Sequence, residues 1–112
     1  EIPQTNPYSR LHENPPAAIL VCGDTRLEKH EGFWVQDCSA ATENMLIEIA
    51  GRGLGGVWLG FFPVPSRVKA IKELFHLPKE VVPLSIVAVG HPAEKPEEAD
   101  RFKPDRIHYE KW

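Results

Sequence analysis

Three glycines in the stretch IAGRGLGGVWLGFFP, residues 49–63, have the spacing of a known binding motif. Gly51, Gly53 and Gly56 reproduce G-x-G-x-x-G. In dinucleotide-binding folds that motif follows a strand and opens a helix, so that the backbone wraps around a pyrophosphate at the helix N-terminus. The spacing therefore raises the hypothesis of a nucleotide-phosphate site.

The order of the flanking elements argues against that hypothesis. A helical pattern precedes the glycines, and the β-rich segment GVWLGFF (56–62) follows them. The C-terminal end of a helix carries partial negative charge and disfavours a phosphate. We therefore interpret the motif as a helix end and a turn, with Gly51 or Gly53 in the left-handed conformation.

Gly60 lies outside the motif, inside the predicted strand 56–62. A glycine within a strand has no side chain to pack, and it often marks the close approach of a ligand or of another backbone. The alternative is that it only accommodates a neighbouring side chain. Gly60 is therefore the candidate for a binding function in this stretch.

Histidine and cysteine show no metal-ligand spacing, although the chain has five histidines and two cysteines. We predict no metal site. An intramolecular disulfide between Cys22 and Cys38 is possible, but two buried free thiols in a reducing compartment are favoured. The chain is therefore expected to be cytoplasmic.

The composition excludes several classes of protein. A length of 112 residues suits one small domain, and 42% hydrophobic with 26% charged residues is ordinary for a globular chain. A net charge of −3 gives no basic footprint for nucleic acid. The longest strongly apolar runs, AAILVC and LSIVAV, are too short to cross a bilayer. We therefore expect neither a nucleic-acid partner nor a membrane.

The elements that must position these residues alternate along the chain. Apolar and β-rich runs predict strands over 17–24, 56–62 and 81–92, and helical periodicity predicts helices over 34–53 and 66–77. The run 17–24 resembles a strand buried on both faces. This order predicts a layered α/β (α+β) fold with about three strands and two main helices.

The helix predicted over 34–53 has the clearest pattern. Asp37 is a candidate N-cap, because its carboxylate can accept from free N–H groups of the first turn. Cys38, Ala41, Met45 and Ile49 form an apolar stripe at helical spacing. This stripe predicts the face that packs on the sheet.

Three strands make a thin sheet, so the chain is expected to be part of a larger assembly. Residues 93–112 form a charged, proline-containing segment that ends in Ile107, His108, Tyr109 and Trp112. Aromatic residues at the end of such a segment usually dock on another surface. We expect an extended C-terminal arm.

Several motifs together resemble one family. WVQDCSAATENMLIEIAGRGLGGVWLGFFP, LFHLPKEVVPLSIVAVGHPAEKP and DRFKPDRIHYEKW occur in the order and spacing of the C-terminal half of the nitroreductase family of FMN-dependent oxidoreductases. The resemblance runs from about Pro3 to Trp112. Nothing here matches the family's Arg-rich opening or its Pro-Ser-x-x-Asn region. Residues 1–112 are therefore expected to be the C-terminal half of one FMN-binding domain, with an N-terminal segment 1–16 and an arm 93–112.

The resemblance implies a function. Such enzymes hold FMN at the interface of an intertwined homodimer, and flavin N5 takes hydride from NAD(P)H and passes electrons to a nitroaromatic, a quinone or a related acceptor. The chemistry belongs to the flavin, so no catalytic side chain is expected. By position, Trp58, Leu59 and Gly60 resemble the strand end whose backbone borders the flavin near N5.

The resemblance also suggests where the phosphate and the substrate bind. Arg101 resembles the arm arginine that contacts the FMN phosphate. Lys103 and Arg106 are alternatives for this role. The structural alternative is that Arg101 is only a solvated charge on the arm. Phe61 and Phe62 are candidates for the substrate pocket, although aromatic residues after a strand often belong to the core.

A second hypothesis belongs to a different class. A chain without the family's N-terminal half is also compatible with a non-enzymatic, truncated module that dimerises or binds a ligand but does not turn over.

Overall fold

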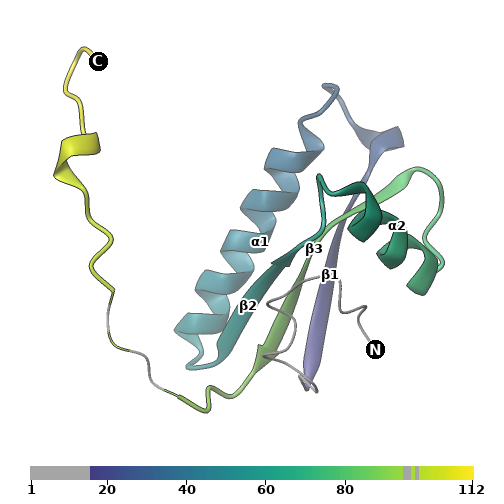
Figure 1. The fold of residues 1–112 in the computed structure, drawn as a ribbon, viewed down its shortest axis with the longest axis horizontal. Coiled ribbons are helices and arrows are strands. Elements are labelled where there is room, and N and C mark those ends of the chain that lie inside the picture. The colour runs from purple at the N-terminus through teal and green to yellow at the C-terminus, as the bar shows by residue number, and fades with distance from the viewer. Residues whose placement is uncertain (1–15, 95–96, 98) are drawn as a thin grey trace.

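The computed structural model describes residues 16–94, 97 and 99–112. The predicted N-terminal segment 1–16 therefore lies outside the described residues except for Pro16. Within these residues strands and helices alternate, together with two short 3₁₀ helices, η2 and η3 (Figure 1). In chain order the elements are β1 (Ala17–Asp24), η2 (Thr25–Leu27), α1 (Trp34–Gly51), β2 (Gly55–Gly60), α2 (Pro65–Leu74), β3 (Val81–Gly90) and η3 (Pro104–Arg106).

The sheet has the order β1-β3-β2, so the last strand in the chain lies in the middle. Both β1 and β2 pair with β3 in antiparallel fashion. The described residues thus form an α+β fold with three strands and two main helices, as the sequence predicts.

The two helices cover opposite faces of the sheet (Figure 1). On the α2 face, Phe61, Ile71 and Ile86 form the buried core cluster. On the α1 face, the hydroxyls of Thr42 and Ser85 lie 3.2 Å apart and both side chains are fully buried. Side chains alternate between the faces of a strand, which is why neighbouring residues of β3 serve the two layers.

Helix α1 begins earlier than the predicted N-cap. Its first residue is Trp34, whose backbone N–H donates to the Glu28 Oε1 atom at 3.0 Å, and Asp37 lies inside the first turn. The prediction for Asp37 was wrong because a carboxylate six residues before Trp34 supplies the cap across a loop. Asp37 still stabilises this end of the helix, since a negative charge in the first turn opposes the helix dipole.

Helix α1 ends where the glycine spacing predicts its C-terminus. The helix ends at Gly51, and Gly53 has a φ of 70°. Leu54 N–H donates to the Ile49 carbonyl and Gly53 N–H to the Ala50 carbonyl, both at 3.0 Å. This pair of bonds is a Schellman motif, which satisfies the last carbonyls of the helix. The glycines of this motif therefore lie at the end of a helix.

Burial differs from the prediction in two elements. In β1 the first three residues, 17–19, are exposed and only Gly23 is buried, because among the described residues this strand is paired on one side only, with β3. In α1 the predicted stripe residue Ala41 is exposed, whereas the polar Thr42 next to it is fully buried. The Thr42 hydroxyl donates a hydrogen bond to the Cys38 carbonyl of the same helix, at 2.7 Å, and is therefore not left unpaired by burial.

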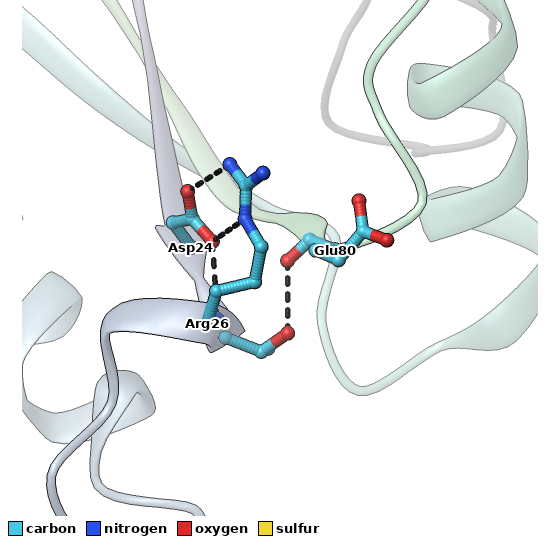
Figure 2. Close-up of polar contacts among 4 residues, drawn as sticks. Asp24, Arg26 and Glu80 are labelled. Carbon is cyan, nitrogen blue, oxygen red and sulfur yellow. Dashed lines mark hydrogen bonds and ion pairs between the residues drawn. The ribbon is translucent and has the colours of Figure 1, made fainter.

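A polar corner joins the end of β1 to the loop before β3 (Figure 2). Arg26 donates to both carboxylate oxygens of Asp24, from Nε at 2.9 Å and from Nη2 at 2.6 Å. Thr25 donates from both its backbone N–H and its hydroxyl to the Glu80 carbonyl, each at 3.0 Å. The corner therefore fixes where β1 stops and η2 begins.

We expect Asp24→Asn to destabilise the protein at neutral pH and to make no difference in acid. The hydrogen bonds from the Arg26 side chain hold the pKa of Asp24 below its usual value. A lowered folded pKa gives stabilisation that is complete above the unfolded value of about 3.9 and is lost as the pH falls through the folded value. Urea unfolding of both forms between neutral pH and the acid limit of folding measures this.

The matched control is Glu48→Gln, which removes a surface ion pair with Arg52. Both partners of that pair are more than 60% exposed, so a smaller loss is expected. An Asp24→Asn deficit that stays constant as the pH falls would contradict the assigned role of the carboxylate.

Candidate functional site

The candidate site is the outer edge of β2, which has no partner strand among the described residues. Phe61 N–H donates to the Leu84 carbonyl at 2.9 Å, which extends the β2–β3 register by one residue. Backbone groups alternate in direction along an antiparallel pair. The N–H and C=O groups of Trp58 and Gly60 therefore point away from β3, toward the open edge.

Gly60 leaves space beside this backbone. A Cβ atom built at Gly60 would meet only the Trp58 Nε1 atom, at 4.0 Å, among the described residues. Its φ lies outside the left-handed region, so the backbone conformation does not require glycine. Room for a close neighbour is the remaining reason for a glycine here, and it agrees with the binding hypothesis made from the sequence.

Aromatic side chains stand beside Gly60. Trp58 and Phe62 are 37% and 38% exposed, and the ring of Phe62 meets that of Trp34 edge-on with centroids 4.9 Å apart. Trp34 is held close to β1, since a Cβ atom at Gly23 would lie 2.5 Å from its Cε3 atom. The first residue of α1 therefore fixes the position of an aromatic wall beside the end of β2.

Leu59 and Phe61 have different surroundings from their neighbours. Their side chains are 3% and 2% exposed, and Phe61 packs in the core cluster with Ile71 and Ile86. By the same alternation, the Leu59 N–H points toward β3. In this chain Leu59 thus offers no side chain to a ligand at the open edge, and the Phe61 side chain belongs to the core.

Arg101 lies apart from this edge. Every described residue of the arm 93–112 is exposed, and Figure 1 shows the arm running away from the sheet, beyond α1. The structure therefore brings together Trp58, Gly60 and Phe62 and leaves Arg101, Lys103 and Arg106 elsewhere.

Arg67 is a further residue at this edge, which reasoning from the sequence did not select. It lies in the first turn of α2, is half-buried, and its Nη1 atom donates to the Gly60 carbonyl at 3.4 Å. A basic residue in a first turn is unfavourable for the helix dipole, and this turn has no acidic residue. That combination is the signal that could have pointed to Arg67.

The two cysteines are free thiols, as predicted, but they are half-buried rather than buried. Burial raises the pKa of both thiols; Cys38 raises that of Cys22 further, and Asp37 that of Cys38. Both therefore remain protonated at neutral pH and are weak nucleophiles.

None of the helices among the described residues is long and apolar enough to cross a membrane. In the same part of the chain, no group of three or more histidine, cysteine, aspartate or glutamate residues is placed to hold a metal ion.

The described residues form a small α+β fold in which the outer edge of β2 has no partner strand. The model of the Nitroreductase family matches residues 6–91, and the chain belongs to that family. A Methanothermobacter thermautotrophicus protein named "Putative NADH dehydrogenase/NAD(P)H nitroreductase" is 49% identical over 112 residues, which is all of this chain and 59% of that protein. The chain thus spans about three-fifths of this relative.

Solved structures are similar as well. The structure of a Clostridium acetobutylicum protein titled "Putative NADH Oxidase" has a TM-score of 0.90 and 39% identity, covering 96% of this chain and 65% of that one. The structure of a Desulfovibrio desulfuricans protein titled "putative nitroreductase in complex with fmn" has a TM-score of 0.70 and 27% identity, covering 85% of this chain and 55% of that one.

Proposed function

We propose that the complete protein is an FMN-dependent oxidoreductase that oxidises NAD(P)H and reduces a small acceptor such as a nitroaromatic or a quinone. The observation that carries the proposal is the open edge of β2, where two backbone N–H groups point outward beside a glycine with free space. Family membership and the FMN complex of a relative support the same conclusion.

The residues at this edge fit a flat, polar-edged ring. The N–H groups of Trp58 and Gly60 are suited to hydrogen-bond ring oxygen or nitrogen atoms, and the missing side chain of Gly60 admits the ring to the backbone. FMN, when bound, supplies hydride acceptance and electron transfer. The fixed N–H groups favour the negative charge of the reduced state, as donors in an oxyanion hole do.

Phe62 and Trp34 have a second role in the proposal. Their partly exposed rings form an apolar wall beside the open edge. Such a wall suits a flat aromatic acceptor and excludes water from the reacting atoms. Phe62 is therefore the side chain of the predicted pair that we retain for the substrate pocket.

The complete site requires more than this chain. We infer that the arm docks on a second copy, because it exposes three aromatic residues: Phe102, Tyr109 and Trp112 are 71%, 85% and 101% exposed. Arg101 would then hold the FMN phosphate through its paired N–H donors. An N-terminal half and a homodimer complete the proposed site, and a cytoplasmic location goes with it.

The test uses the natural full-length polypeptide. We expect the purified protein to show the visible absorbance of oxidised flavin with about one FMN per chain, a dimer mass by light scattering, and NAD(P)H oxidation that depends on an added nitroaromatic or quinone. A folded dimer that stays colourless after FMN is added would contradict the proposal. That outcome would favour the non-enzymatic module.

A further inference from the structure

We propose that Arg67 is a positioning residue of the flavin site, which fixes the Gly60 carbonyl and places a positive charge beside the ring edge. This inference rests on the proposed function and assigns a role to a residue on a different element, α2. Its starting point is the hydrogen bond from Arg67 Nη1 to the Gly60 carbonyl, at 3.4 Å.

The Gly60–Phe61 peptide is hydrogen-bonded at both of its ends. Its N–H end is bound to the Leu84 carbonyl at 2.9 Å, and its C=O end accepts from Arg67. Glycine loses more conformational freedom on folding than any other residue, so a glycine at a site needs outside restraint. Holding both ends of this peptide restricts Gly60 and thereby the direction of its own N–H group.

The positive charge of Arg67 is the second feature that supports this role. The ion pairs among the described residues are Asp24–Arg26, Glu48–Arg52 and Lys69–Glu73, and Arg67 takes part in none of them. Arg67 is half-buried and its hydrogen bond to Gly60 is partly buried, where charges are screened less than at the surface. The positive end of α2 adds to the same field, since Arg67 lies in its first turn.

The restraint of the Gly60–Phe61 peptide and the positive charge of Arg67 both act at the open edge of β2. The Gly60 carbonyl points to that edge, so the guanidinium that binds it lies at the edge as well. A positive charge there interacts more strongly with reduced flavin, which is the more negative form, than with oxidised flavin. Arg67 therefore raises the reduction potential of the bound flavin in addition to ordering Gly60.

The alternative is that Arg67 only closes the turn between β2 and α2. The two roles separate in the reduction potential of bound FMN, which a purely structural bond would leave unchanged. We expect Arg67→Gln to weaken binding of reduced relative to oxidised FMN by about tenfold, which corresponds to a fall of about 30 mV in the two-electron potential. Gln keeps a hydrogen-bond donor, so this variant removes mainly the charge.

Two further variants complete the experiment in the full-length protein. Arg67→Lys restores the charge without the planar donor group, and we expect it to recover most of the potential. Lys69→Met removes an exposed charge two residues away on the same helix and is expected to leave the potential unchanged. Amide hydrogen exchange of the FMN-free protein should be faster at Phe61, whose N–H is bonded to the Leu84 carbonyl, in Arg67→Met than in wild type.

The outcomes distinguish this inference from the function on which it rests. A wild-type potential in Arg67→Gln overturns the role of Arg67 and leaves the proposed function standing. A fall in potential that Lys69→Met reproduces also overturns it, because the effect would then be one of net charge. Failure of the wild-type protein to take up FMN overturns both proposals.

Discussion

Replacement of Gly60 by valine is expected to lower FMN affinity by about 100-fold while the fold remains intact. Packing a side chain into occupied space costs on the order of 1–3 kcal/mol, and each 1.4 kcal/mol is tenfold in affinity. Without the ligand, the one described atom that a Cβ atom here would meet is Trp58 Nε1, at 4.0 Å. Valine also suits a strand better than glycine does.

The measurement is a titration of the FMN-free, full-length protein with FMN, followed by flavin fluorescence. Gly60→Ala is expected to give an intermediate loss. Gly55→Ala is the control in the same strand, because its Cβ atom would make ordinary contacts at 3.6 Å with Gly90 and Pro92. Wild-type FMN affinity in Gly60→Val would show that the flavin does not approach β2 at this residue.

A second large effect is expected from Phe61→Ala, this time on stability. Phe61 is 2% exposed and packs against Ile71 and Ile86 between α2 and the sheet. Truncation of a buried phenylalanine to alanine typically costs about 3–5 kcal/mol, because a cavity remains. That is a large part of the 5–15 kcal/mol by which a typical protein is stable.

The neighbouring residue provides the control. Phe62 is 38% exposed, and its ring meets that of Trp34 edge-on. Phe62→Ala is expected to cost less than Phe61→Ala, because more of the Phe62 side chain is already in water. Chemical denaturation of the two variants side by side measures the difference. Equal losses would mean that Phe61 and Phe62 do not face different environments.

The elements of the fold could be predicted from the sequence because their signals are local. Apolar runs located the three strands, and helical periodicity with the glycines located α1 and its end. What failed depended on contacts between distant residues. Asp37 looked like an N-cap because no local rule reveals that the Glu28 carboxylate reaches Trp34. Ala41 was expected in the core because a hydroxyl partner for Thr42 on β3 cannot be foreseen from α1 alone.

The candidate site divides in the same way. Gly60 could be proposed as a site residue from its own position, since a glycine inside a strand is unusual wherever it occurs. Arg67 could not, because its hydrogen bond to the Gly60 carbonyl depends on the packing of α2 beside the end of β2. The sequence alone does not distinguish the adjacent residues Phe61 and Phe62. The path of the chain after β2 places Phe61 in the core and Phe62 against Trp34.

The strand order has a consequence for the way this chain is made. The central strand is the last of the three to be synthesised, and its pairing with β1 joins Ala17 to Val89. The pairing that joins β1 and β2 through β3 can therefore form only after β3 has left the ribosome. Contacts so distant in sequence form slowly, so this part of the sheet is expected to assemble late in translation.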